Sequence, residues 1–201
     1  MTRAREGSKA DTKRRRLIDA GLELIEELPY AEITAAMIAE RAGMARTLVF
    51  YYFEDKETLF RAVVRDLLNG LRSSFEANDL LAAPDPMAWL RHEVAIFFDF
   101  MSAHPQAMAT ILGQGWENVE DDAGATMMDF TAGRVREAFG APPHDELLDA
   151  ALHSWAYHCV DLEARIQRTA PGSDRRVVAA LLVGQLEAVF SILGTPVRAG
   201  S

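Results

Sequence analysis

The sequence has little of what secreted, membrane-bound or metal-binding proteins use. Its single cysteine, Cys159, cannot form an intrachain disulfide and lacks the partners of a structural zinc site. The longest uninterrupted apolar runs, such as residues 179–184, fall far short of the roughly 20 residues that a membrane helix needs. No apolar stretch follows the charged residues 1–16, as a secretory signal would require. We therefore expect a cytoplasmic protein with no membrane span, metal or cofactor.

Residue patterns typical of enzymes are also missing. There is no glycine-rich phosphate loop and no nucleophile elbow. His153 and His158 are five residues apart on one predicted helix, so they point about 140° away from each other and make a poor metal pair. The neighbours His158 and Cys159 diverge by about 100°, which prevents a direct nucleophile–base pair. We therefore predict that the chain is not an enzyme.

Positive charge is scarce overall but concentrated at the beginning of the chain. Lys and Arg total 21 against 30 Asp and Glu, for a net charge of −9. A basic segment that precedes an acidic remainder can bind phosphate groups while the remainder limits non-specific binding, although a solvated, disordered tail is the alternative. The basic residues within 1–16, against Glu6 and Asp11, are Arg3, Arg5, Lys9, Lys13, Arg14, Arg15 and Arg16.

The distribution of apolar residues predicts an all-α fold. No segment alternates with period two over the length of a strand, whereas apolar residues recur at helical spacing almost throughout. Between residues 76 and 86 the composition shifts to small, polar and proline residues, so we expect a connection there. The predicted helices are 12–27, 34–42, 45–53, 56–75, 87–103, 105–113 with an extension past Trp116, 123–139, 144–168 and 173–193.

Residues 34–53 have the spacing of a DNA-reading helix pair, because only Gly43 and Met44 separate two short helices. Thr34 is the expected N-cap of the first helix, and Gly43 ends it in the left-handed conformation. In the second helix Val49 and Phe53, four residues apart, should point into the core. The side chains then left facing outward are those of Arg46, Thr47, Tyr51 and Tyr52. A short exposed helix with such side chains fits the roughly 12 Å major groove of B-DNA.

The aromatic run Phe50, Tyr51 and Tyr52 has a second interpretation, in which all three side chains pack in a small core. Three consecutive helical positions sweep about 200°, so they cannot all face inward. This arrangement favours the DNA-binding interpretation.

With these residues in view, the segment resembles the TetR family of repressors. The resemblance lies in the stretch Ile38-Ala39-Glu40-Arg41-Ala42-Gly43-Met44, the aromatic run ending at Phe53, and Lys56-Glu57 with Leu59, and it is densest from Arg16 to Val64. It implies that the N-terminus of the helix after Thr34 meets a phosphate. It also implies a set of DNA-facing positions, which are Thr34, Arg46, Thr47, Leu48, Phe50, Tyr51, Tyr52 and Lys56.

Four positions depart from the family pattern. Pro29 stands where a glycine is usual, Ala45 replaces a polar N-cap, Leu48 a common threonine, and Phe50 a tyrosine whose hydroxyl would bind a phosphate. These changes leave the fold prediction intact but keep an alternative function open. That alternative is a helical binding module in which sequence-specific DNA binding is weak or lost.

The larger C-terminal part, residues 77–201, is rich in large apolar side chains. The resemblance implies that some of them line a site for a small-molecule effector, which we expect to be apolar or aromatic, while the alternative for each is ordinary core packing. The candidates are Phe97, Phe98, Met101, Met108, Ile111, Trp116, Met127, Met128, Phe130, His153 and Tyr157.

The last two predicted helices carry apolar stripes that step by three or four residues, as in a helix bundle. The resemblance implies that these helices pair across a two-fold axis into a dimer interface, whereas the alternative is that the stripes serve the monomer's own core. The interface candidates are Leu148, Leu152, Trp155, Cys159, Leu162, Leu182, Leu186 and Val189. We thus expect a basic arm and helix-turn-helix domain in residues 1–55, a linking helix that starts within 56–76, and an effector-binding and dimerisation domain in 77–201. Together these parts predict a repressor that binds a palindromic double-stranded DNA operator as a homodimer and is released by a ligand.

Overall fold

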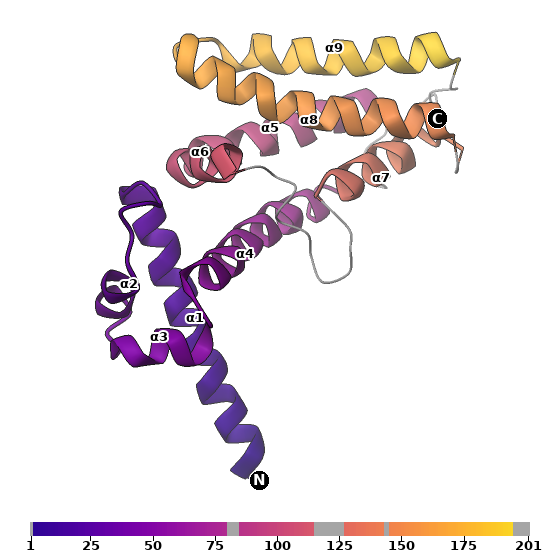
Figure 1. The fold of residues 1–201 in the computed structure, drawn as a ribbon. Coiled ribbons are helices and arrows are strands. Elements are labelled where there is room, and N and C mark those ends of the chain that lie inside the picture. Colours follow the sequence, from indigo (N-terminus) through magenta and orange to yellow (C-terminus); the bar gives the residue numbers. More distant parts are fainter. Residues whose placement is uncertain (1, 80–84, 115–126, 143–144, 195–201) are drawn as a thin grey trace. The chain divides into compact units, whose positions relative to one another are not determined.

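The computed structural model describes residues 2–79, 85–114, 127–142 and 145–194, with the backbone alone for 2–8 and 112–114. Every regular element in these ranges is an α-helix, which confirms the predicted fold class. The helices are α1 (Thr2–Glu27), α2 (Ala35–Arg41), α3 (Arg46–Tyr52), α4 (Lys56–Glu76), α5 (Pro86–Ala103), α6 (Pro105–Gln114), α7 (Met127–Phe139), α8 (Glu146–Thr169) and α9 (Arg175–Leu193) (Figure 1).

The helices form two compact units. The first contains α1, α2, α3 and α6, together with α4 as far as Gly70. The second contains the last turns of α4 from Leu71 onward, with α5, α7, α8 and α9. The helix α4 is therefore the one continuous element, among the described residues, that belongs to both units.

The core of the first unit forms where α1 and α4 approach closely. Leu17, Val49 and Phe53 are almost completely buried there. A Cβ atom placed on Gly21 would lie 2.8 Å from Cγ2 of Val63, so only glycine lets α4 pack this tightly against α1.

The two short helices α2 and α3 are joined as the sequence predicts. The Thr34 hydroxyl accepts a hydrogen bond of 3.3 Å from the Met37 backbone N–H at the start of α2. Gly43 has a φ of 63°, in the left-handed region where glycine avoids the steric cost of a Cβ. The Arg16 guanidinium of α1 donates to the Ala42 carbonyl at 2.6 Å, which satisfies an otherwise free acceptor at the end of α2. Ala45, which precedes α3, provides no side-chain cap.

The second unit is a bundle whose core joins α7, α8 and α9. The rings of Phe139 and Phe190 stack with centroids 4.3 Å apart. The Trp155 indole N–H donates to the Leu182 carbonyl at 2.9 Å, so the buried indole has its partner in α9.

The predicted helix ends agree with the structure to within two residues, except at α1. The sequence predicted its beginning at residue 12, whereas α1 begins at Thr2. Alanine, arginine, lysine and glutamate are good helix formers, and their summed propensity extends the helix through the basic segment. The backbone of the basic segment is therefore helical, in contrast to the alternative of a disordered tail. The predicted extension past Trp116 and the starts at 123 and 144 lie outside the described residues.

Among the described residues, α9 has the length and apolar composition of a membrane-crossing helix, a test that core helices of soluble proteins also pass. Uninterrupted apolar runs do not indicate such a helix, because Gln185 and Glu187 interrupt the apolar residues of α9. Val178, Leu182 and Leu186 of α9 are buried in the second unit, which explains the apolar character of that side of the helix.

Candidate nucleic-acid interface

The surface of α3 presents an unusual set of side chains. Tyr51 is 77% exposed and Phe50 is 47% exposed, far more than rings of this size commonly are. Arg46 and Thr47, one turn earlier, are also exposed. The Arg46 guanidinium carbon lies 5.8 Å from the centre of the Phe50 ring, so the two side chains form one surface. We call these four residues the α3 face.

The rest of α3 anchors that face to the first unit. Val49 and Phe53 are buried, in agreement with their four-residue spacing. Leu48 and Tyr52 are half-buried, and the Tyr52 ring meets that of Tyr51 edge-on at 5.0 Å. Since its inner side is fully packed, α3 holds the exposed side chains in fixed positions.

Two further sequence candidates make contacts within the first unit. The Thr34 hydroxyl caps α2 as described. The Lys56 ammonium donates to the Tyr30 carbonyl at 2.7 Å and lies 4.0 Å from the centre of the Tyr30 ring. Partial burial lowers the pKa of Lys56. The structure thus places the Lys56 charge against the loop before α2, where it supports the helix pair.

The electrostatics around the α3 face favour an anionic partner. No acidic residue lies between Glu40 and Glu54 in the sequence. Arg41 donates to Glu27 at 2.6 Å and to Glu23 at 3.3 Å, and these contacts offset the nearest acidic side chains of α1. The hydrogen bond from Arg41 lowers the pKa of Glu27, which keeps that carboxylate ionised and paired. The face can therefore offer donors and aromatic surface without local repulsion of phosphate.

The residues predicted to line an effector site are divided between the two units. Phe97, Phe98 and Met101 of α5 and Met128 of α7 are buried in the second unit, while Met108 and Ile111 of α6 are buried in the first. Met127 and Phe130 are half-buried, Tyr157 is exposed, and Trp116 lies outside the described residues.

The candidate His153 has both ring nitrogens engaged by the protein itself. Its Nδ1 lies 2.8 Å from the Asp149 carbonyl oxygen, and its Nε2 lies 2.6 Å from a carboxylate oxygen of Asp129. Its imidazole would have to break one of these contacts before it could bind a ligand. The structure thus gives His153 a role in joining α8 to α7.

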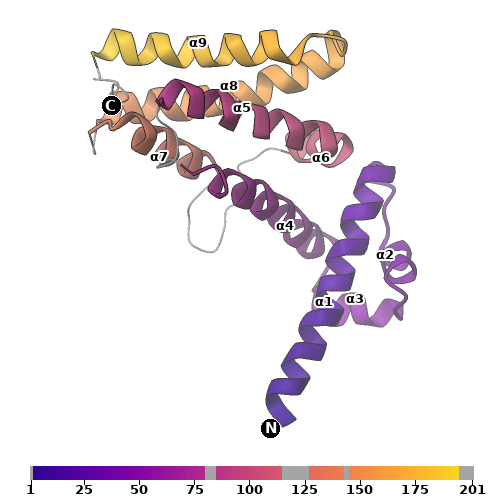
Figure 2. The same cartoon turned by 180° about the vertical axis from the view of Figure 1, so that it is seen from behind.

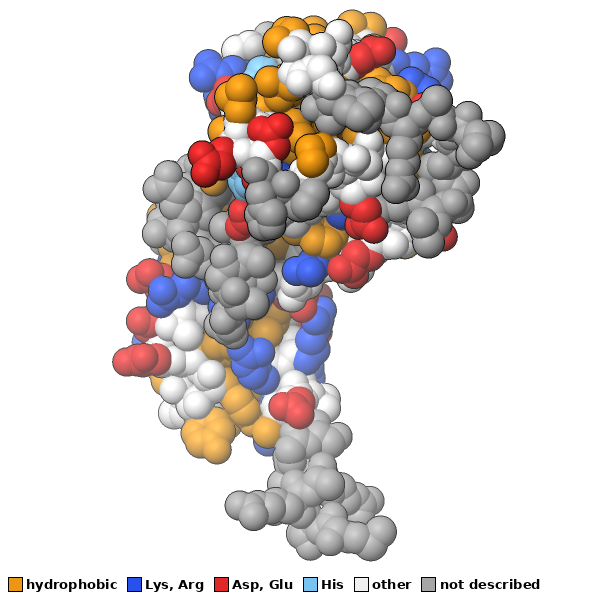
Figure 3. Space-filling view, turned by 90° about the vertical axis from the view of Figure 1, so that its right-hand side faces the viewer, with side chains coloured by type: hydrophobic (Ala, Val, Ile, Leu, Met, Phe, Trp, Pro, Cys, Tyr) orange, Lys and Arg blue, Asp and Glu red, His pale blue; other side chains and the backbone are white. Residues whose placement is uncertain are grey.

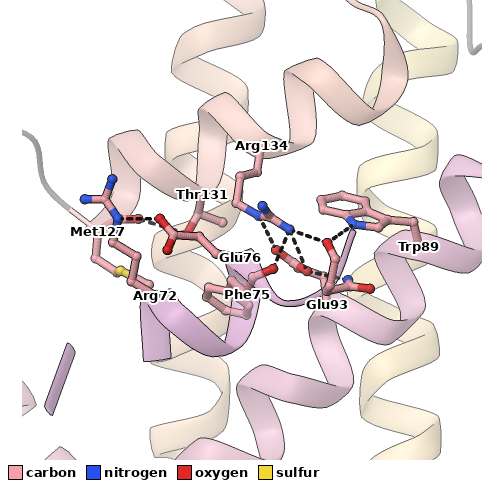
Figure 4. A network of polar contacts seen from close by, with 9 residues as sticks. Arg72, Phe75, Glu76, Trp89, Glu93, Met127, Thr131 and Arg134 are labelled. Atoms are coloured by element: carbon pink, nitrogen blue, oxygen red, sulfur yellow. Dashed lines mark hydrogen bonds and ion pairs between the residues drawn. The ribbon is translucent and has the colours of Figure 1, made fainter. Parts of the chain in front are cut away.

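A buried ionic network in the second unit was not predicted from the sequence (Figure 4). The Arg134 guanidinium of α7 donates to Glu93 of α5 at 2.7 Å, and to the carbonyl oxygens of Phe75 at 2.6 Å and Asn78 at 2.9 Å. The Asn78 amide donates to the other Glu93 oxygen at 2.6 Å. Arg134 thereby holds the C-terminal end of α4, where unpaired carbonyls need donors. Periodicity does not reveal such a pair, because on its own helix each charge looks like a surface residue.

The dimer candidates differ in burial. Leu148, Leu152, Trp155, Cys159, Leu182 and Leu186 are all buried inside the second unit, while Leu162 and Val189 are half-buried. The six buried side chains pack in the core of the second unit, as the alternative left open by the sequence describes. Leu162 and Val189 keep exposed surface that a partner subunit could contact.

A different side of α9 is apolar and exposed, and apolar side chains are visible at the top of Figure 3, where α9 lies. Its members step by three or four residues, so they share one side of the helix. Ile192 is 83% exposed, and Gly184 and Ala188 would let another helix approach closely. We call this set the α9 outer face, and it consists of Val177, Leu181, Gly184, Ala188 and Ile192.

The first unit thus has the parts of a helix-turn-helix DNA-binding domain. Two short helices meet at a left-handed glycine, and the second of them is anchored on one side and exposed on the other. The sequence profile described as "Bacterial regulatory proteins, tetR family" matches residues 17–63, which cover this unit from α1 to α4.

Named relatives agree with this match. The chain is 40% identical over 88 residues to the HTH-type transcriptional regulator BetI of Escherichia coli O45:K1 (strain S88 / ExPEC), an alignment that covers 44% of this chain and 45% of that protein. The chain therefore spans about half the length of the curated relatives it matches. These relatives are named as transcriptional regulators, in agreement with the prediction that the chain is not an enzyme.

Solved structures extend the similarity of fold beyond the first unit. A tetR-family transcriptional regulator from Streptomyces coelicolor has a TM-score of 0.69 at 20% identity, covering 90% of this chain and 82% of that one. RolR in complex with resorcinol has a TM-score of 0.62 at 20% identity, covering 96% and 92%. At such low identity these structures establish the fold alone. Residues 17–63 thus match the DNA-binding part described for the TetR family, and the whole chain shares its fold with solved TetR-family regulators.

Proposed function

We propose that the chain is a repressor that binds an inverted-repeat operator as a homodimer and leaves it when a small molecule binds. The α3 face is the observation that carries the DNA-binding part. Its guanidinium and hydroxyl groups can hydrogen-bond base edges and phosphates, and its Phe50 ring can contact a thymine methyl group. The surrounding first unit holds these groups in place before DNA arrives.

Selection of bound sequences from a random pool of DNA duplexes tests this proposal. Purified protein should recover an inverted repeat whose half-sites lie one helical turn, about 34–36 Å, or a multiple of it apart. Repetition at several salt concentrations separates specific from purely electrostatic binding. Recovery of unrelated sequences with strongly salt-dependent affinity would contradict the proposal. That result would favour the alternative of a binding module that has lost sequence specificity. Two features support this alternative, since Ala45 provides no side-chain cap for α3 and Phe50 has no hydroxyl group.

The α9 outer face supports the homodimer. The side of α9 that faces away from its own core is apolar, and a partner that buries this side would remove it from water. A second copy of the same helix is such a partner, because its large residues can pack against the small residues of the first copy. Two α3 faces in one dimer would read two half-sites, which raises affinity and specificity together.

Sedimentation velocity tests the dimer directly. Leu181→Glu and Ile192→Glu place a charge on the α9 outer face and should convert the dimer to monomer. Ala36→Glu, on exposed α2 of the first unit, adds the same charge elsewhere and should leave the dimer intact. A wild-type protein that sediments as a monomer at micromolar concentration would overturn the homodimer.

The helix α4 supports coupling between effector and DNA, because it runs continuously from the first unit into the second. Its last carbonyl groups are held by Arg134 of α7, so a shift of α7 on ligand binding would pull on α4. The effector side chains that we still propose belong to the second unit and are chiefly the buried Phe97 and Met101 of α5 and the half-buried Phe130 of α7. An aromatic effector is compatible with these rings, and RolR was solved with the aromatic molecule resorcinol.

Linkage gives this coupling a strict test. A compound that releases the operator in a fluorescence-anisotropy screen must bind the protein–operator complex more weakly, and by the same factor by which it weakens operator binding. Calorimetric titration with and without operator measures that factor. Equal affinities in the two titrations would exclude release by the compound. In this scheme residues 1–55 bind the operator, α4 transmits, residues 77–201 hold the effector and the partner, and the protein acts in the cytoplasm.

A further inference from the structure

The basic segment at the beginning of α1 precedes the residues that the family profile matches. The family profile begins at residue 17, whereas α1 begins at Thr2. Figures 1 and 2 show the N-terminal part of α1 passing beside α3 and continuing beyond it. The N-terminal part of α1 therefore lies next to α3 within the first unit.

The three consecutive arginines of the segment are engaged in folding the first unit. Arg16 caps α2 through the Ala42 carbonyl, and Arg15 pairs with Asp19 at 2.7 Å and with Asp66 of α4. The Arg14 guanidinium carbon lies 4.9 Å from the centre of the Phe53 ring at the end of α3. Their charges are thus largely occupied by the protein.

The two lysines differ from the arginines in this respect. Lys9 and Lys13 are exposed, and neither ammonium has a partner among the side chains that the structure describes. Their four-residue spacing places them on the same side of α1. No internal contact among the described side chains accounts for these two charges, so they are available to an external anion.

Their position indicates which anion. At 3.6 residues per turn, Lys9, Lys13 and Arg16 lie within about 60° of arc around α1. Arg16 reaches the turn between α2 and α3, so the lysines line up with the helix-turn-helix, roughly 4.5 and 10.5 Å further along the axis. A duplex whose major groove receives α3 would bring its phosphate backbone past this side of α1.

We propose that Lys9 and Lys13 bind DNA phosphates that flank the bases read by α3, so that the helical start of α1 extends the footprint of each half-site. The inference rests on the proposed DNA-binding function. It assigns these contacts to the two lysines and excludes Arg15 and Arg16, which stabilise the fold instead.

The salt dependence of binding to the selected operator tests this assignment. Each lost phosphate contact reduces the steepness of the plot of log K against log salt by about 0.9. In the double variant Lys9→Ala/Lys13→Ala the slope should therefore be less steep by about 1.8 per protomer. Its preference for the operator over a random duplex should stay unchanged, because phosphate contacts carry no sequence information. The double variant Arg91→Ala/Arg168→Ala changes the net charge equally in the second unit and should keep the wild-type slope.

The outcomes separate this inference from the proposed function. If wild-type protein binds the operator and the lysine variant, folded by circular dichroism, keeps the wild-type slope, the lysine contacts are refuted and the function stands. An equal loss of slope in the arginine control would also refute them, since a general charge effect would then explain the result. If wild-type protein binds no duplex, the proposed function fails and this inference fails with it.

Discussion

Replacing Arg134 by methionine should destabilise the second unit severely, because it leaves a buried carboxylate without its cation. The Arg134 and Glu93 side chains are only 12% and 6% exposed. Without the guanidinium, Glu93 keeps only the Asn78 amide. The carbonyl groups of Phe75 and Asn78 each lose one of two donors, and keep the Asn78 N–H at 2.9 Å and the Trp89 indole N–H at 3.4 Å, respectively. Breaking one partner of a buried ion pair typically costs about 3–5 kcal/mol. In a chain of this length that corresponds to a fall in Tm of about 6–20 °C.

Arg72 provides a matched control. Like Arg134 it lies over the Phe130 ring, at 4.4 Å, and it pairs with Glu76 at 3.1 Å. Its side chain is 41% exposed, however, so Arg72→Met should cost at most about 1 kcal/mol. Stacking on Phe130 and ion pairing occur in both variants, so the contrast between them measures burial together with the two backbone carbonyl contacts of Arg134.

Urea denaturation followed by tryptophan fluorescence measures both costs, because Trp89 and Trp155 are buried in the second unit. The double variant Arg134→Met/Glu93→Leu removes both charges, and it should therefore be more stable than Arg134→Met alone. A cost of Arg134→Met no larger than that of Arg72→Met would refute the reasoning. A double variant that is less stable than Arg134→Met alone would also refute the reasoning.

Three other variants or treatments test separate parts of the structure. The Asp55 carboxylate caps α4 by accepting a hydrogen bond of 2.7 Å from the Thr58 backbone N–H, and this hydrogen bond lowers the pKa of Asp55. The cap therefore stabilises the protein fully above the ordinary pKa of Asp, and this stabilisation is lost as the pH falls through the lower pKa of the folded state. Acid unfolding of Asp55→Ala should accordingly lack this component, and an unchanged acid limb would argue against the cap. Burial raises the pKa of the Cys159 thiol, so iodoacetamide at neutral pH should label it only after unfolding in urea, and rapid labelling of native protein would contradict its place in the core. Gly43→Ala should lower Tm, because φ is 63° and the added Cβ would lie 3.2 Å from the Arg16 guanidinium; equal thermal stability would exclude that strain.

The sequence predicted the local features of the first unit well, since short-range patterns determine them. The left-handed Gly43, the Thr34 cap and the inward Val49 and Phe53 each follow from a residue type at a fixed offset. The predicted start of α1 was wrong because the charged residues of 2–11 are equally typical of a solvated tail. Only the summed helix propensity of that segment could have indicated the longer helix.

The second unit was harder because its helices are apolar on more than one side. In α9 the stripe of Leu182 and Leu186 and the neighbouring stripe of Leu181 and Ile192 both have helical spacing, and spacing alone does not say which one faces the core. The sequence prediction assigned the buried stripe to the dimer. The Arg134–Glu93 pair joins residues 41 positions apart, a contact that no local pattern can indicate.

The most direct test of the central claim is the affinity of Arg46→Ala and Tyr51→Ala for the operator obtained by selection. Both side chains are exposed and outside the core, so each variant should fold and sediment like wild type. Each should nevertheless lose most of its preference for the operator over a random duplex, as when contacts worth about 1–3 kcal/mol to base edges are removed. Wild-type affinity and specificity in both variants would show that the α3 face does not read DNA.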